Sequence, residues 1–167
     1  MHHEYCPRCG LKLIPRKIGD EGLVPYCTAC AMPLFDSFAT CVICAVVNDD
    51  HQVALLRQPD LARTTRVCVS GYMKPGESAE DAAVREIGEE LGLPIEGVTY
   101  MGSWPMTSKP MLMLGFMART HGSAFTLSGE VENAAWFPYD KALGEIREDS
   151  IAWLLVKSVI DRETTAE

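Results

Sequence analysis

The stretch from residue 71 to residue 93, GYMKPGESAEDAAVREIGEELGL, concentrates six carboxylates and only two cations. Its net charge of −4 is half of the formal charge of −8 that the whole chain carries. Ser78, followed three residues later by Asp81, resembles a capping box, so we expect a helix to begin just after Ser78 and to end at Gly92 and Pro94. Any fold of this chain therefore has to accommodate a strongly acidic helix at residues 79–91.

Three carboxylates of this expected helix lie on one side of it. At 100° per residue, Glu86, Glu89 and Glu90 fall within an arc of about 100°. Like charges at such spacing destabilise an isolated helix by a few tenths of a kcal/mol. We expect Arg85 to pair with Asp81 and Glu89, which leaves Glu86 and Glu90 without a cation on the helix. An uncompensated carboxylate cluster is what a hard divalent cation requires, so the helix predicts a metal site.

Four of the seven cysteines form two Cys-x-x-Cys pairs, Cys6 with Cys9 and Cys27 with Cys30. Each pair can place two thiolates on one side of a tight turn, and two such turns can surround Zn²⁺. Two disulfides in a secreted protein are the alternative, but the number of cysteines is odd and no apolar signal segment follows the start of the chain. A four-thiolate iron site stays open, because the sequence separates such metals poorly.

A third Cys-x-x-Cys pair, Cys41 and Cys44, lies in the apolar run TCVICAVV, which is typical of a buried strand. Side chains three residues apart on a strand point to opposite faces of the sheet, so these two thiols cannot readily share a metal ion. We expect Cys41, Cys44 and Cys68 to be small apolar core residues.

The chain is expected to divide into a small module at residues 1–35 and a main domain at residues 36–167. The small module has too little apolar sequence for a core of its own, so a bound metal would supply much of its folding energy. In the main domain the pattern predicts a second helix at 150–160, capped by Asp149 or Ser150. Strands are predicted at 40–47, 53–57, 66–70, 97–103, 111–118 and 134–138. Together these elements indicate an α+β or α/β sandwich.

Composition limits the partners of the chain. Hydrophobic residues make up 47% of it, which is enough for a real core. The net charge of −8 argues against binding to the phosphate backbone of DNA. No apolar run is long enough to span a bilayer, and no signal segment is found, so we expect a cytoplasmic protein without membrane association.

Every defined position of the Nudix box is present between residues 71 and 93, so chance agreement is negligible. These positions are Gly71, Glu77, Arg85-Glu86-Ile87, Glu89-Glu90 and Gly92-Leu93. The chain therefore resembles the Nudix hydrolases, a family that cleaves nucleoside diphosphates linked to another group. The resemblance implies an α/β/α sandwich with a mixed sheet, here preceded by a zinc ribbon, and Mg²⁺ or Mn²⁺ held against a pyrophosphate.

The resemblance also implies roles for individual residues. Metal ligands would be the carbonyl of Ser70 and the carboxylates of Glu86, Glu89, Glu90 and Glu130. Glu130 lies in SGEVENAAWFPYD, which resembles the family's segment preceding its Trp-Phe or Trp-Tyr strand, and a surface glutamate in a turn is the alternative there. The catalytic residues would be Glu86, Glu89 and Glu90, with Glu89 as the general base.

A four-cysteine ribbon directly before a Nudix domain resembles the NADH pyrophosphatase branch. The segment GSWPMTSKPMLMLGFMA agrees with the signature of that branch at Trp104-Pro105, but Met106-Thr107 replace its Phe-Pro. NADH or NAD, cleaved to NMN(H) and AMP, is therefore the expected substrate. ADP-ribose, a nucleoside triphosphate, an NAD-capped RNA end and a non-catalytic nucleotide-binding module stay open.

Four residues are candidates to contact the substrate. Tyr72 and Trp104 can stack on a planar ring, with core packing as the alternative. Pro105 follows from the branch signature. Ala152 aligns with a substrate-contacting backbone position at the start of the last helix, where free N–H groups favour an anion. A homodimer is expected.

Overall fold

The computed structural model describes residues 4–59 and 65–165. The chain separates into two compact units, Met1–Ala39 and Thr40–Glu167. Each unit is described by itself.

The N-terminal unit is built around a three-stranded antiparallel sheet. Its strands, in the order in which they pair, are β1 (Ile14–Lys17), β2 (Leu23–Cys27) and β3 (Met32–Pro33), with a single 3₁₀ turn at Gly19–Glu21. Among the described residues of this unit, the buried apolar cluster consists of Cys6, Cys27 and Leu34, with Leu13 and Cys30 packed against them. So small a core cannot balance the entropy of ordering the unit, which is the situation in which proteins use metals or disulfides.

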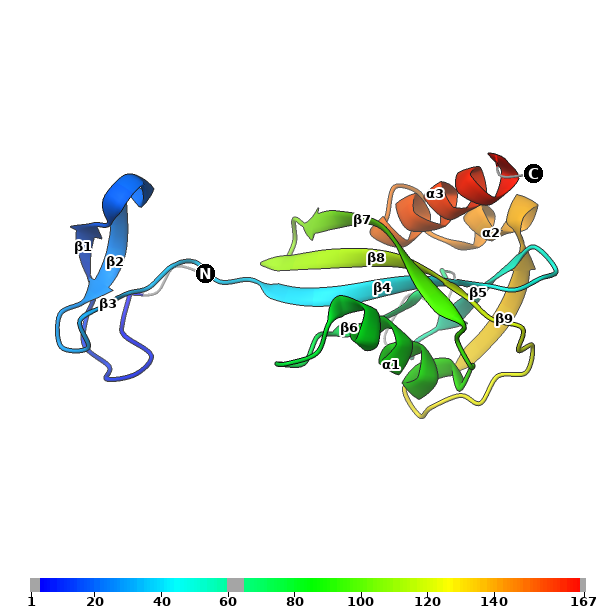
Figure 1. The fold of residues 1–167 in the computed structure, drawn as a ribbon, viewed down its shortest axis with the longest axis horizontal. Helices are drawn as coiled ribbons and strands as arrows, with labels where there is room; N and C mark the ends of the chain where they lie inside the picture. Colours follow the sequence, from blue (N-terminus) through cyan, green and yellow to red (C-terminus); the bar gives the residue numbers. More distant parts are fainter. Residues whose placement is uncertain (1–3, 60–64, 166–167) are drawn as a thin grey trace. The chain divides into compact units, whose positions relative to one another are not determined.

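The second unit contains a six-stranded sheet. Five strands follow one another in the order β7 (Gly97–Met106), β8 (Met111–Arg119), β4 (Ala39–Val47), β5 (Gln52–Arg57) and β9 (Asn133–Pro138), and β6 (Val69–Tyr72) pairs with β4 off this path. Most pairings are antiparallel. The neighbours β8 and β4 run in the same direction (Figure 1). The Thr120 N–H after β8 donates to the Val47 carbonyl at the end of β4. The predicted mixed sheet is thus confirmed.

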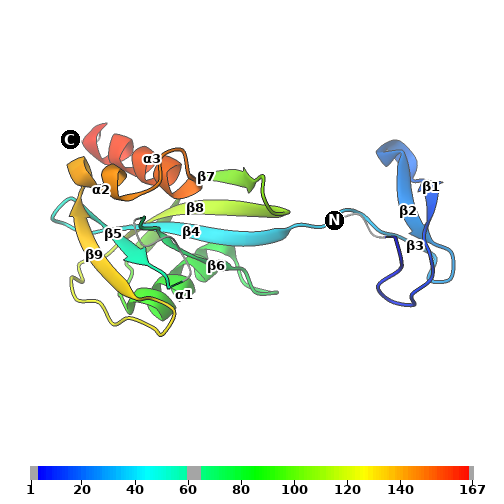
Figure 2. The same cartoon turned by 180° about the vertical axis from the view of Figure 1, so that it is seen from behind.

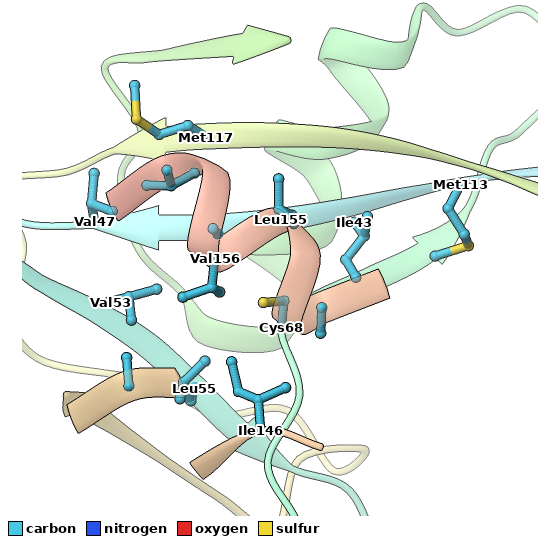
Figure 3. Packing of buried hydrophobic residues seen from close by; sticks show 14 of the residues in the cluster. Ile43, Val47, Val53, Leu55, Cys68, Met113, Met117, Ile146, Leu155 and Val156 are labelled. Carbon is cyan, nitrogen blue, oxygen red and sulfur yellow. The ribbon is translucent and has the colours of Figure 1, made fainter. Parts of the chain in front are cut away.

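Helices cover both faces of this sheet. Figure 1 shows α1 (Ala79–Leu91) on one face and α2 (Tyr139–Glu145) with α3 (Ile151–Thr165) on the other, and Figure 2 shows the same layers from behind. Under α3, the side chains of Leu155 and Val156 pack with Ile43 and Val53 of the sheet (Figure 3). The predicted α/β/α sandwich is confirmed.

Strand β4 shows why the sheet is apolar on both faces. Alternate residues Ile43 and Ala45 join the core under α3, whereas Val42 and Cys44 join the core under α1. Cys41 lies with the first set, so the expectation that the two thiols point to opposite faces is confirmed. Burial raises the pKa of Cys44 and Cys68 well above the usual thiol range, in keeping with their expected role as small core residues.

Several elements differ from expectation. Strand β7 was predicted to end at residue 103 but continues to Met106. The strand predicted at 66–70 begins only at Val69, because Arg66 and Val67 make isolated bridges to Ile146 and Leu56 instead of a continuous ladder. Helix α3 continues beyond residue 160 to Thr165. Helix α2 was not predicted. In the described parts of the chain, no helix has the length and apolar character needed to cross a membrane.

Candidate functional site

Helix α1 is fixed at both ends by its own sequence. The Asp81 N–H donates to Ser78 Oγ at 3.1 Å, and Ser78 adopts the extended backbone of an N-cap. At the other end Gly92 takes a left-handed φ of 64°, and its N–H donates to the Gly88 carbonyl at 3.1 Å. The predicted limits of the acidic helix are confirmed. Because Ala82, Ala83, Ile87 and Leu91 face the sheet, the rotation of the helix is set as well.

Arg85 organises the carboxylates at the exposed side of α1. Its Nε and Nη2 donate to the two oxygens of Glu77 at 3.0 and 2.7 Å, and its Nη2 also donates to the Tyr72 carbonyl at 3.1 Å. Its Nη1 donates to Glu86 at 2.6 Å and to Glu89 at 3.0 Å. Hydrogen bonds from Arg85 lower the pKa of Glu77 to about 2. Glu77 also accepts the backbone N–H of Lys74, so it ties the loop before α1 to the helix.

Two pairing expectations were wrong. Arg85 binds Glu86, which was expected to have no cation, and the carboxylate of Asp81 instead accepts the hydroxyl of Ser78. The prediction considered only neighbours three or four residues apart. A guanidinium lies several bonds beyond its Cβ, and its planar fork can reach a side chain of the next residue.

Glu90 is the buried carboxylate of the site. Glu90 is only 4% exposed to solvent, and its Oε2 has no hydrogen-bond partner among the described residues. Burial, followed by the charges of Glu86 and Glu130, raises the pKa of Glu90 to about 7, although the backbone of Ser70 donates a hydrogen bond to it. A buried acceptor that lacks a partner is costly in a folded protein. A buried carboxylate oxygen without a partner, next to other carboxylate charges, suits a hard divalent cation.

The backbone of β6 lies directly against these carboxylates. A Cβ atom built on Gly71 would be 2.0 Å from Cδ of Glu86, so only a glycine leaves space for that carboxylate. Ser70, the preceding residue, pairs with Ile43 of β4 and donates to Glu90. The backbone of Ser70 and Gly71 therefore lies against the carboxylates of Glu90 and Glu86, and Arg85 links Glu86 to Glu89. Their joint role as metal ligands stays a prediction.

Glu130 reaches the same region from the long loop before β9. The Ser128 N–H donates to the Glu90 carbonyl at 3.3 Å, which fixes this loop on the end of α1. Glu130 itself is exposed, and its charge is close enough to raise the pKa of Glu90. The loop thus brings the charge of Glu130 close to Glu90, and its role as a metal ligand stays a prediction.

A pocket of about 690 Å³ adjoins the acidic cluster at Ser70. Its walls come from β4, β6, β7, β8 and the first turn of α3, and they include Trp104, Pro105 and Ala152 among the predicted substrate contacts. Apolar side chains dominate the lining, among them Ile43, Met106 and Met113. The shape and chemistry suit a planar, mostly apolar group attached to an anion.

Tyr72 and Trp104 occupy different environments. Tyr72 is 59% exposed, which excludes core packing for it, and it does not line the pocket. The Trp104 ring packs on Gly115, where an added Cβ would lie 2.4 Å from the ring, and it also lines the pocket. Trp104 therefore packs as a core residue and also lines the pocket, and its stacking on a substrate ring stays a prediction.

Several lining residues were not predicted from the sequence, namely Arg66, Val67, Cys68, Thr107, Ser108, Arg147, Asp149, Ser150, Ile151 and Leu154. Of these, Ser150 carried a usable signal, because its hydroxyl accepts the Trp153 N–H at 3.2 Å as a helix cap. Asp149 was the alternative cap, and Thr107 and Ser108 lie in the segment that resembles the branch signature. No local motif marks the others.

A second candidate centre lies in the N-terminal unit. The sulfurs of Cys6, Cys9, Cys27 and Cys30 all lie within 4.8 Å of one another. The Cys9 and Cys27 sulfurs are 3.5 Å apart, too far for a disulfide bond. Backbone hydrogen bonds from Arg8 and Cys9 lower the pKa of Cys6 to about 7, which favours the thiolate that metals bind. The predicted grouping is confirmed, and four thiols at these distances fit a tetrahedral metal ion.

The comparisons with known proteins match this arrangement. The NUDIX domain profile matches residues 38–155. A protein of Stutzerimonas stutzeri (strain A1501) named NAD-capped RNA hydrolase NudC is 32% identical over 163 residues, which are 96% of this chain and 57% of that protein. The protein of the same name from Pseudomonas aeruginosa (strain LESB58) is 30% identical over 168 residues, 99% of this chain and 58% of that protein. The chain thus spans little more than half the length of these curated relatives.

Solved structures agree in fold. A NUDIX hydrolase from Nitrosomonas europaea superposes with a TM-score of 0.75 at 16% identity, covering 99% of this chain and 94% of that chain. The NUDIX domain of Shewanella oneidensis NrtR, crystallised with ADP ribose, gives a TM-score of 0.66 at 14% identity over 83% of this chain and 94% of that one. At such identities the likeness concerns the fold alone.

Proposed function

The chain belongs to the NUDIX domain family, and from this premise we propose that it hydrolyses the pyrophosphate bond of a nucleoside diphosphate linked to a second group. The observation that carries the proposal is Glu90, a buried carboxylate with an unpartnered oxygen beside three further acids. Glu86, Glu89, Glu90 and Glu130, with the carbonyl of Ser70, would hold Mg²⁺ or Mn²⁺. Such an ion supplies positive charge to the phosphate oxygens and makes a water molecule more acidic.

Glu89 is our candidate for the general base. Among Glu86, Glu89 and Glu90 it is the most exposed, with 53% of its side chain accessible, so it can meet a water molecule. Arg85 and Lys74 contact its two oxygens at 3.0 and 3.5 Å and orient the carboxylate. In the proposed step water attacks a phosphorus atom, its proton passes to Glu89, and the bridging P–O bond breaks. Two nucleoside monophosphates result from a dinucleotide substrate.

We propose NADH or NAD as the substrate, giving NMN(H) and AMP. The names of the curated relatives support this choice, as do the four-cysteine cluster before the domain and the pocket that adjoins Ser70. An NAD-capped RNA end has the same chemistry at the bond to be cleaved. ADP-ribose is the second candidate, because a structure of the same fold was crystallised with it. In the N-terminal unit we propose that the four cysteines bind one structural Zn²⁺.

A substrate panel tests the proposal. The purified chain is incubated with NADH, NAD, ADP-ribose and a nucleoside triphosphate, with Mg²⁺ or with Mn²⁺, and products are separated by chromatography. The proposal expects AMP and NMNH from NADH, and no products when EDTA is present. A lack of hydrolysis of every substrate with either metal would leave a nucleotide-binding module as the better account.

A further inference from the structure

The turn between α2 and α3 forms part of the pocket wall and is held firmly in place. The Arg66 N–H donates to the Glu145 carbonyl at 2.9 Å, and Ile146 is buried and pairs with Arg66. The Ser150 N–H then donates to the Arg147 carbonyl at 3.2 Å, and Asp149 takes a left-handed φ of 58°. The backbone of Arg147 is therefore positioned from both sides.

The side chain of Arg147 is available for a ligand. Arg147 lines the pocket and is exposed, and within residues 4–59 and 65–165 no hydrogen bond or ion pair engages its guanidinium. Arg66, the other cation in the lining, is occupied differently. It hydrogen bonds to Asn133 at 3.1 Å, lies 3.5 Å from a Glu145 oxygen and stacks over Phe137 at 4.8 Å.

The charges around the pocket suggest what the guanidinium of Arg147 could bind. The chain carries a net charge of −8, and Ser70 of the pocket wall hydrogen bonds to Glu90, which interacts with the charges of Glu86, Glu130 and Glu89. A phosphate that approaches this region is repelled unless positive charge is close by. A guanidinium matches phosphate because it donates two parallel hydrogen bonds from a rigid plane. An arginine already engaged in the fold, such as Arg66, has fewer donors left to offer.

We propose that Arg147 binds a phosphate group of the substrate at this pocket and thereby contributes to substrate specificity. This proposal rests on the proposed function. The phosphate has two possible sources, the pyrophosphate that is cleaved and a further phosphate on the nucleoside that enters the pocket. Both present the same chemistry to Arg147, and they differ in which substrates depend on it.

The test compares NADH with NADPH, which carries an additional 2′-phosphate, in the wild type, Arg147→Ala and Arg147→Lys. The control is Lys141→Ala, which removes an exposed cation of α2 that does not line the pocket. If Arg147 meets the cleaved pyrophosphate, Arg147→Ala lowers kcat/KM about tenfold for both substrates. If it meets an outer phosphate, the loss is confined to NADPH. Arg147→Lys keeps the charge and should recover part of the loss.

A binding measurement separates this proposal from the proposed hydrolysis. Dissociation constants of ADP and of 2′-phospho-AMP are measured by calorimetry in EDTA, so that no metal-dependent turnover contributes. Arg147→Ala should weaken binding of at least one of them about tenfold, and Lys141→Ala should leave both unchanged. Unchanged dissociation constants together with unchanged kcat/KM values in Arg147→Ala would overturn the proposal. A chain that binds these nucleotides through Arg147 but hydrolyses nothing would overturn the proposed function alone.

Discussion

The Glu86 carboxylate lies against the backbone of Gly71, so closely that a Cβ on Gly71 would be 2.0 Å from Glu86 Cδ. This contact joins β6 to α1 and brings the Ser70–Gly71 backbone to the acidic cluster. The loop and the helix of the motif therefore form one site because a single glycine lacks a side chain.

Gly71→Ala should displace the Glu86 carboxylate and lower turnover by about tenfold or more, because displacement of about 1 Å at a reacting group has large effects on rate. Gly88→Ala is the matched control. Gly88 is an exposed helix position with open space around it, so alanine there should raise the free energy of unfolding by up to about 1 kcal/mol without lowering activity. Equal activity of the two variants would show that the Gly71 contact has no part in function.

Glu77 should stabilise the main domain in a pH-dependent manner. Its pKa is lowered from 4.5 to about 2 by Arg85, so its contribution is complete above the unfolded value and is lost as the pH falls towards 2. The difference in unfolding free energy between wild type and Glu77→Gln should therefore shrink between pH 5.5 and pH 3.5, values chosen to bracket the unfolded pKa of about 4.5. All three tryptophans lie in the main domain, so their fluorescence reports its unfolding separately. A difference that stays constant over this range would contradict the assignment.

The N-terminal unit should contain one zinc ion per chain. Cys9→Ser should lose the metal, since three thiolates and one hydroxyl bind Zn²⁺ far less tightly than four thiolates. Cys44→Ala is the control, because Cys44 has the same Cys-x-x-Cys spacing but lies in the core under α1. Metal analysis by mass spectrometry gives the stoichiometry. A preparation without zinc, or a Cys44→Ala variant that loses it equally, would refute the site.

The pocket wall at Met106 should affect the choice of substrate. Met106 lines the pocket and offers a flexible side chain where an aromatic ring would be rigid. An aromatic contact contributes on the order of 1 kcal/mol, so Met106→Phe should raise the ratio of kcat/KM for NADH over ADP-ribose several-fold. An unchanged ratio would show that the segment around Met106 does not contact the nicotinamide ring of the substrate.

Local sequence signals predicted α1 well, because both of its ends carry capping residues and its apolar face has helical spacing. They did not predict α2. That helix has seven residues, follows Pro138 without a side-chain cap and buries only Ala142, so it depends on packing against the rest of the fold. Strand β6 also depends on its partner. It pairs with residues 41–44 of β4, whereas β5 pairs with Val46 and Val47 of the same strand.

The acidic cluster was predictable as a set, but its internal pairing was not. Helical spacing placed Glu86, Glu89 and Glu90 on one side, whereas the reach of Arg85 to Glu86 depends on the rotamer of a long side chain. Arg147 lies on a turn whose position relative to Ser70 is set by the packing of α2 and α3. No local sequence pattern carries that information.

Turnover of Glu90→Gln at saturating Mg²⁺ tests the central claim most directly. The substitution keeps the size of the side chain and removes one carboxylate oxygen, and Glu80→Gln, at an exposed position on the same helix, is the control. Turnover should fall at least about a hundredfold in Glu90→Gln, with an unfolding midpoint that does not decrease, because a metal ligand is lost and a buried charge is removed. Turnover close to that of the wild type, at a Mg²⁺ concentration that saturates both, would contradict the role of Glu90 as a metal ligand.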